Sequence, residues 1–200
     1  MKFLSKIVIG LIEAYIRITY RPKGIFINKE IQSNKLTQPC ILIANHPAYY
    51  DPLVMYTIFR GKKTIVIAKD MLEKNWILKD MDLISCDRFS MDTQWIQGAK
   101  KALSEGKSVI IFPEGKTRRD GQLNEFKSGF AFLARYTGVP VVSVGLDGNY
   151  KFGHKVHYVV DVPETITRTK GVASSVDLAQ KCEYFQKKVV SLKARALEGK

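Results

Sequence analysis

A histidine and an aspartate five positions apart, His46 and Asp51, form the pair in this chain best suited to proton transfer. The segment Asn45-His46 directly follows the apolar run 40–44, which is typical of a buried strand, so His46 stands at a strand's carboxyl end, where α/β sheets commonly bind ligands. Pro47 favours an extended backbone at His46, and Asp51 before Pro52 has the pattern of a helix N-cap followed by a first-turn proline. The intervening loop can fold Asp51 back onto the imidazole, which would fix the tautomer and leave the other ring nitrogen free as a base. The structural alternative is that Asp51 only caps the helix and His46 only bonds to backbone.

A second polar cluster follows the strand-like run 108–112 and gathers cations and polar donors around one glutamate. Its residues are Pro113, Glu114, Gly115, Lys116, Thr117, Arg118, Arg119, Asp120 and Gly121. Glycine lets the backbone approach a ligand, and arginine forks match phosphate oxygens in pairs, so the cluster predicts an anion-binding loop. A solvated basic turn is the alternative. A further cation, Arg88, follows a weaker strand pattern at 82–86, where a surface salt bridge is the alternative.

Short β-branched runs alternate with longer helical stretches, which predicts an α/β fold with a mostly parallel central sheet flanked by helices. Strands are expected at 40–44, 63–68, 82–86, 108–112, 140–145 and 155–161. Helices are expected at 52–59, 71–79, 93–105, 127–137 and from Ser175, as the N-cap, to about Ala196. Gly106 and Gly138 are expected to close two of these helices in the left-handed conformation, and 21–24 has the pattern of a turn.

Residues 1–24 are expected to form an N-terminal amphipathic helix ahead of one domain over 25–200. At about 100° per residue, the polar positions fall within one narrow sector and apolar side chains cover the rest. These polar positions are Lys2, Lys6, Gly10, Glu13 and Arg17. Such a helix fits either a lipid headgroup layer, helped by Arg21, Lys23 and Lys29, or the core of its own domain. No run of about 18 apolar residues occurs, so no membrane-spanning helix is expected.

The 200 residues include 32 basic and 19 acidic side chains, which gives a net charge of +13. A negatively charged partner is therefore expected, and charge alone leaves nucleic acid, an anionic bilayer, phosphorylated metabolites and an acidic carrier protein open. The three cysteines form an odd set without a close pair, which argues against a disulfide framework and a zinc knuckle. His154 and His157 would point to opposite faces of a strand, so no metal site is expected.

Four groups of residues, in this order along the chain, resemble the sequence blocks of the glycerolipid acyltransferase family, whose best-known members are the 1-acyl-sn-glycerol-3-phosphate acyltransferases. The groups are Asn45-His46 with Asp51, Asp87-Arg88, Phe112-Pro113-Glu114-Gly115 and Val139-Pro140-Val141-Val142. The first group corresponds to the family's His-x4-Asp motif. The resemblance implies transfer of a fatty acyl group from acyl-CoA or acyl carrier protein to the hydroxyl of a lysophosphatidate-like acceptor in phospholipid synthesis, without a cofactor.

By the same resemblance, His46 is the general base and Asp51 orients it. The residues implied to bind substrate are Asn45, Arg88, Glu114, Gly115, Lys116, Thr117 and Arg118. The family's third block commonly reads Phe-Pro-Glu-Gly-Thr-Arg-Ser, whereas Lys116, Thr117 and Arg118 occupy the last three places here. Either Arg118 reaches the acceptor phosphate after a local shift of the loop, or Lys116 substitutes as a point charge.

The expected location is the cytoplasmic face of a membrane, as a peripheral or monotopic protein with the anionic membrane surface as a partner. Two alternatives remain open: an acyltransferase for a different lyso-lipid acceptor, and a basic nucleic-acid- or lipid-binding protein without catalysis. Nucleic acid is not expected as a partner, because neither end of the chain offers a recognised base-reading motif or an aromatic stacking ladder.

Overall fold

One sheet at the centre of this computed structural model contains seven strands within the described residues, which are 3–27, 35–74, 82–87, 93–118, 122–151 and 153–199. The strands are β1 (Lys23–Phe26), β2 (Ile41–Ala44), β3 (Lys63–Ala68), β4 (Leu83–Cys86), β5 (Ser108–Ile111), β6 (Val141–Leu146) and β7 (His157–Glu164). Their order across the sheet is β1-β7-β6-β2-β5-β3-β4. Neighbouring strands run parallel except β6 and β7, so β1 and β7 oppose the direction of the rest. The expected α/β fold with a mostly parallel sheet is confirmed.

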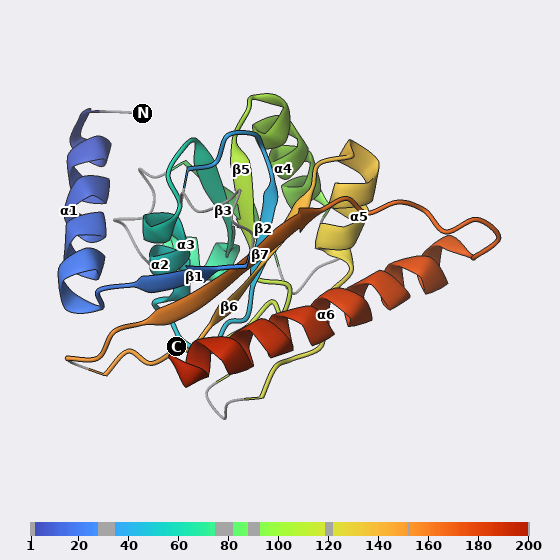
Figure 1. Ribbon diagram of the computed structural model, residues 1–200. Helices are drawn as coiled ribbons and strands as arrows, with labels where there is room; N and C mark the ends of the chain where they lie inside the picture. Colours follow the sequence, from blue (N-terminus) through green and yellow to red (C-terminus); the bar gives the residue numbers. More distant parts are fainter. Residues whose placement is uncertain are drawn as a thin grey trace.

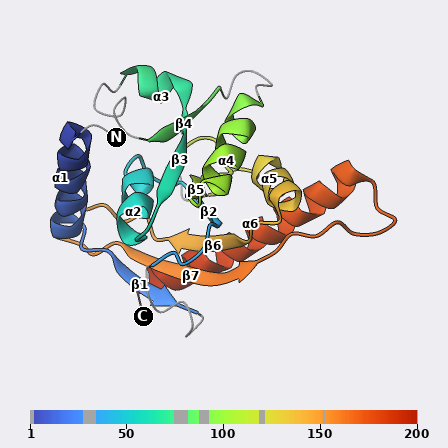
Figure 2. The same ribbon diagram turned by 90° about the horizontal axis from the view of Figure 1, so that it is seen from above.

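Helices cover both faces of the sheet, and α6 runs diagonally across β6 and β7 (Figure 1). The helices are α1 (Phe3–Thr19), α2 (Asp51–Ile58), α3 (Lys69–Lys74), α4 (Gln94–Ser104), α5 (Gly129–Thr137) and α6 (Ser174–Glu198). α1 and α2 contribute Ile16 and Met55 to the core on one face, whereas α4, α5 and α6 contribute to the core on the other. Figure 2 shows α1 at one end of the molecule, well separated from α4 and α5.

Strand β2 lies in the middle of the sheet, and its side chains alternate between the two cores. Ile41 and Ile43 face α4, α5 and α6, whereas Leu42 and Ala44 face α1 and α2, and all four are 0% exposed. A strand covered on both faces must be apolar throughout, which explains this run. Because β5 and β6 both pair with β2 in parallel, the segments that follow these three strands start at the same edge of the sheet.

Two local predictions are wrong. The turn expected over 21–24 does not include residues 23 and 24, which belong to the edge strand β1 paired with β7; the segment Lys-Gly-Ile-Phe carries little β pattern of its own. Asp51 is the first helical residue of α2, and Tyr50 occupies the N-cap position without a side-chain cap bond. The Asp51 carboxylate does not cap the helix because it is directed at His46.

The helix ends agree better with expectation than the helix starts. Gly106 and Gly138 have φ values of 77° and 68°, which confirms the left-handed ends expected for them. α6 begins at Ser174 and has Ala173 at its N-cap position, so the prediction that Ser175 is the N-cap is wrong. The helix predicted over 71–79 is described only as α3, which begins two residues earlier; the rest of that prediction lies outside the described residues.

Helix α1 packs on its own domain, which is one of the two arrangements considered for it, and leaves its other side exposed. One side packs on the domain, where Ile9 and Ile16 are buried and Nη2 of Arg17 donates to the carbonyl oxygen of Thr57 at 2.6 Å. The opposite side is an exposed apolar strip formed by Ile7 (44% exposed), Leu11 (66%), Tyr15 (52%) and Ile18 (76%). Within the described part of the chain, no helix combines the length and the apolar character needed to cross a membrane.

Candidate active site

His46 and Asp51 form a hydrogen-bonded pair between the end of β2 and the start of α2. Nδ1 of His46 lies 2.9 Å from Oδ2 of Asp51; the carboxylate side chain is 0% exposed and the imidazole 15% exposed. An ionised carboxylate can only accept, so in the neutral imidazole this bond places the proton on Nδ1 and leaves Nε2 unprotonated. Among the described residues, Nε2 has no hydrogen-bond partner. A partly exposed imidazole in this state can take a proton from a bound hydroxyl.

Three donors hold the Asp51 carboxylate. Besides His46, the backbone amide of Ala48 donates to Oδ2 at 2.7 Å, and the hydroxyl of Tyr150 donates to Oδ1. Burial raises the pKa of Asp51 above its usual value, while the hydrogen bonds from His46, Tyr150 and Ala48 act to lower it. All three partners donate, so the hydrogen bonds favour the ionised carboxylate and resist the effect of desolvation.

The His46 imidazole is held at its edge by Asp51 and on its face by an aromatic ring. The ring of His46 lies against the ring of Phe112, with centroids 4.4 Å apart and planes tilted by 30°. Phe112 is the first residue after β5, the parallel neighbour of β2. The contact fixes the rotation of the ring that the bond to Asp51 alone would leave free.

The Glu114 carboxylate joins the loop after β5 to the loop after β2. Its Oε1 accepts from the backbone amide of His46 at 2.7 Å, and its Oε2 accepts from the amide and the side-chain Nδ2 of Asn124 at 2.8 and 3.2 Å. Glu114 is 3% exposed, and the backbone amide of Arg118 donates to the His46 carbonyl oxygen at 3.2 Å. The histidine and the glutamate, 68 residues apart, are therefore in direct contact.

The basic loop 116–118 leaves this junction toward solvent. Gly115 sits at a φ of 68°, and a Cβ there would lie 3.2 Å from Cε and Nζ of Lys127. Lys116 and Thr117 are exposed, and Arg118 is partly buried with its Nη2 donating to Oε1 of Gln122 at 3.0 Å. The loop thus gathers cations next to His46, as an anion-binding loop requires.

For two residues expected to bind substrate, Asn45 and Arg88, the described part of the structure shows no position at a substrate site. Asn45 is 1% exposed and exchanges hydrogen bonds with the backbone of Leu146, from Nδ2 at 2.8 Å and to Oδ1 at 2.7 Å. These two hydrogen bonds join the end of β2 to the end of β6, at the residue just before His46. Arg88 lies outside the described residues, as does Arg119.

Sequence reasoning missed Tyr150 and Asn124. Tyr150 lies on the connection after β6 and reaches Asp51 across 99 residues of chain. One signal could have found it: a tyrosine just after the expected turn at Asp147, at the carboxyl end of the strand parallel to β2. Asn124 carried no such signal, because its contacts depend on how the loop after β5 returns to Glu114.

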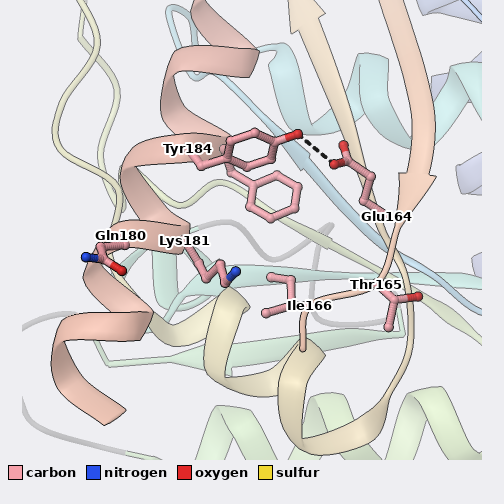
Figure 3. Close-up of a pocket in the computed structure, with 7 residues that line it drawn as sticks. Glu164, Thr165, Ile166, Gln180, Lys181 and Tyr184 are labelled. Carbon is pink, nitrogen blue, oxygen red and sulfur yellow. Dashed lines mark hydrogen bonds between the residues drawn. The ribbon is translucent and has the colours of Figure 1, made fainter. Parts of the chain in front are cut away.

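A separate cavity of about 300 Å³ lies between α6 and residues 164–166 (Figure 3). Glu164 at its rim accepts from the Tyr184 hydroxyl at 2.8 Å. Glu164 pairs with Val141, at the amino end of β6, so the cavity lies at the edge of the sheet opposite His46. Within the described residues, no group of three His, Cys, Asp or Glu side chains could hold a metal ion.

Comparisons with known proteins identify the same region. A family model described as Acyltransferase matches residues 26–147. The chain is 31% identical over 142 residues to a probable 1-acyl-sn-glycerol-3-phosphate acyltransferase of Mycoplasma pneumoniae, covering 66% of this chain and 51% of that protein. It is 29% identical over 119 residues to a chloroplastic 1-acyl-sn-glycerol-3-phosphate acyltransferase of Brassica napus, covering 56% and 34%. The chain thus spans about half, or less, of the length of these curated relatives.

A solved structure has a similar fold over almost the whole chain. The 1-acyl-sn-glycerophosphate (LPA) acyltransferase PlsC of Thermotoga maritima matches with a TM-score of 0.66 at 23% identity, covering 95% of this chain and 81% of that one. The family model spans more than half of the chain and includes His46, Asp51 and Glu114. The protein therefore belongs to the acyltransferase family.

Proposed function

We propose that this chain transfers a fatty acyl group from an acyl thioester to the hydroxyl of a lysophosphatidate-like acceptor, with His46 as general base and Asp51 as the residue that orients it. The observation that carries the proposal is the Asp51-bonded imidazole of His46, whose Nε2 has no partner among the described residues. The backbone amide of the same residue is hydrogen-bonded to Glu114, at the base of the cationic loop. The curated relatives are described as 1-acyl-sn-glycerol-3-phosphate acyltransferases, which supports the same reaction.

The proposed reaction proceeds in two stages. In the first, Nε2 of His46 takes the proton of the acceptor hydroxyl while that oxygen attacks the thioester carbonyl carbon, giving a tetrahedral oxyanion and an imidazolium. In the second, the carbon–sulfur bond breaks and the imidazolium returns the proton to the leaving thiolate, giving the ester and a free thiol. Asp51 stabilises the imidazolium through the Nδ1–H bond between the two stages. No covalent acyl-enzyme is required.

The acceptor phosphate is assigned to the basic loop 116–118 together with Arg88, which the family resemblance implies. Lys116 offers a point charge at the surface, and the backbone of Arg118 is bonded directly to His46, so a phosphate at this loop lies near the base. Glu114 serves the acceptor indirectly, because its carboxylate holds the backbone amide of His46 in place. Gly115 provides the left-handed turn that brings the loop to this position.

The exposed apolar strip of α1 is proposed to contact an anionic membrane surface. The strip lies on the side of α1 facing away from the domain, and a chain of net charge +13 is attracted to anionic lipid. Acceptor and product of the proposed reaction are themselves membrane lipids, so this placement keeps the enzyme close to both.

Thiol release tests the activity. The purified protein is mixed with a lyso-acceptor and either acyl-CoA or acyl carrier protein, and free thiol and esterified lipid are measured together. We expect acceptor-dependent release that falls by about 10²-fold or more in His46→Ala. His154→Ala, at an exposed histidine, is the matched control and should keep the native rate. Equal rates in the native chain and in His46→Ala would overturn the mechanism, and a panel of lyso-acceptors would identify the preferred one.

Vesicle sedimentation tests the membrane contact. We expect the protein to sediment with phosphatidylglycerol-containing vesicles and to remain in solution with pure phosphatidylcholine vesicles. Replacing Leu11 and Ile18 together by serine should weaken this binding, since both side chains are exposed and their loss leaves the core unchanged. Serine at the exposed Val190 of α6 is the control. Undiminished binding of the α1 variant would exclude the strip as the contact.

A further inference from the structure

Tyr150 makes the third contact with the carboxylate that orients the proposed base. We infer that Tyr150 is a positioning residue: its hydroxyl fixes the Asp51 carboxylate and thereby sets the orientation and proton affinity of His46. This inference rests on the proposed function. Residue 150 lies on the connection between β6 and β7, beyond the region 26–147 matched by the family model.

The three hydrogen-bond donors to the Asp51 carboxylate are distributed over its two oxygens. Oδ2 receives His46 Nδ1 at 2.9 Å and the Ala48 amide at 2.7 Å, whereas Oδ1 receives the Tyr150 hydroxyl. Asp51 is 0% exposed, and Tyr150 is the donor recorded for Oδ1 among the described residues. Without that hydroxyl, Oδ1 would be buried without a donor and the carboxylate would lose the bond that opposes its rotation away from the imidazole.

Aromatic rings fix the position of Tyr150. Its ring meets that of Tyr20 edge to face, with centroids 5.2 Å apart at 90°, and lies 5.7 Å from the ring of Tyr50. Tyr20 is buried at the end of α1, and its carbonyl oxygen accepts from the amide of Val156 at 2.9 Å. The ring of Tyr150 is thus held by two aromatic contacts, with Tyr20 just after α1 and with Tyr50 just before α2.

The same connection packs directly on the histidine loop. Gly148 has a φ of 67°, and a Cβ there would lie 2.5 Å from Cγ of Pro47. Pro47 follows His46, so the segment 147–150 contacts the histidine loop through backbone and the aspartate through the Tyr150 hydroxyl. This packing restricts the movement of Tyr150 relative to His46 and Asp51.

The hydroxyl remains a donor at every pH used in an assay. Burial and the negative charge of Asp51 raise the pKa of Tyr150 well above its usual value, with smaller effects from Asp147 and Tyr20. Tyr150 therefore donates to Asp51 and does not compete with His46 for a proton. A donor to the carboxylate withdraws negative charge from it, so the Asp51–His46 pair holds its shared proton less tightly.

Tyr150→Phe removes only the hydroxyl and tests the inference. We expect kcat to fall about 10-fold, the KM values for both substrates to stay within about 2-fold, and the acid limb of the pH profile to move about one unit to higher pH. Tyr184→Phe is the matched control, because Tyr184 also donates to a carboxylate, that of Glu164, at the opposite edge of the sheet. A native rate and an unmoved acid limb in Tyr150→Phe would overturn the inference.

Two further measurements separate positioning from mere folding. In the Asp51→Asn background, adding Tyr150→Phe should have no further effect on kcat; an independent, multiplying loss would overturn the inference. 3-Fluorotyrosine introduced at position 150 keeps the ring and the hydroxyl but is a stronger donor, so the acid limb should move to lower pH. An unmoved limb with the fluorinated residue would contradict the role even if Tyr150→Phe fails to fold.

Nitrogen-15 NMR of the histidines gives a readout that does not need the reaction. The His46 signals, assigned with His46→Ala, should show the Nδ1–H tautomer in the native chain and a higher titration midpoint in Tyr150→Phe. If no acceptor supports His46-dependent thiol release but the midpoint moves as expected, the proposed function fails and the positioning role stands. An unmoved midpoint refutes the positioning role whatever the activity.

Discussion

Replacing Asp51 by asparagine is expected to lower kcat by about 10²–10⁴-fold, the range typical of losing a positioned general base. The substitution keeps the size of the side chain and removes its charge. Each tenfold change corresponds to about 1.4 kcal/mol, so the expected loss of transition-state stabilisation is about 3–5 kcal/mol.

The hydrogen bonds of Asp51 explain the size of this effect. The carboxylate meets three donors, His46 Nδ1, the Ala48 amide and the Tyr150 hydroxyl, and it is fully buried. An asparagine offers one acceptor oxygen and an NH₂ group, so its NH₂ must face at least one of these donors. The imidazole can resolve the conflict by moving its proton to Nε2 and accepting at Nδ1, but Nε2 then cannot act as a base.

The assay is acceptor-dependent thiol release measured over a range of pH, with circular dichroism and a thermal melt to confirm folding. Asp177→Asn is the control, since Asp177 is also 0% exposed and pairs with a cation, Arg135 at 3.2 Å, at the start of α6. The control should keep the native kcat. A folded Asp51→Asn protein with kcat within about threefold of native would refute the reasoning that the carboxylate sets the tautomer of His46.

The remaining predictions concern neighbouring contacts and stability. Glu114→Gln should lower both the melting temperature and kcat, at least tenfold for kcat, because the loop that carries His46 loses a charged acceptor; a native kcat would contradict this. Ser143→Ala should raise the free energy of unfolding by about 1 kcal/mol, and the melting temperature by about 2–4 °C, because the buried Ser143 hydroxyl has no partner among the described residues; a lower melting temperature would show that the hydroxyl is satisfied. Burial raises the pKa of the Cys40 and Cys182 thiols to about 11, so at pH 8 only about one in a thousand of these thiols is ionised. Iodoacetamide should therefore modify Cys86, which is less buried, before the other two cysteines. Mass spectrometry of the labelled native protein checks this, and rapid labelling of either buried thiol would contradict it.

Local features of the sequence predicted the parts of the site that are close in the chain. His46 and Asp51 are five residues apart, and the strand before them is apolar at every position, so a turn and a buried strand were sufficient to place them. The sequence also placed the glutamate loop after a strand of a mostly parallel sheet, and in such a sheet the carboxyl ends of parallel strands share one edge. The hydrogen bond from the His46 backbone amide to the Glu114 carboxylate is consistent with that placement.

The sequence could not predict contacts that depend on packing between distant segments. Strand β1 has an exposed lysine and a glycine, and it is held by pairing with β7, Lys23 opposite His157, rather than by its own pattern. The side-chain direction of Glu114 has the same origin, because its partner is a backbone amide 68 residues earlier and every residue carries such an amide. Propensity and periodicity hold no information about which amide is chosen.

Three adjacent parallel strands supply the contacts around the proposed base. β2 carries His46, β5 is followed by the ring and carboxylate that hold it, and β6 is followed by Tyr150. These contacts are made between groups of the protein, so the base is oriented before any substrate binds, and the reaction then needs only the correct placement of a hydroxyl and a thioester. Substitutions at Asp51 or Tyr150 should therefore act on kcat, because they change the base without changing the surface that substrates meet. Substitutions of Lys116 or Arg118 should act first on the KM of the phosphorylated acceptor, and a variant of this loop that lowers kcat alone would place the phosphate elsewhere.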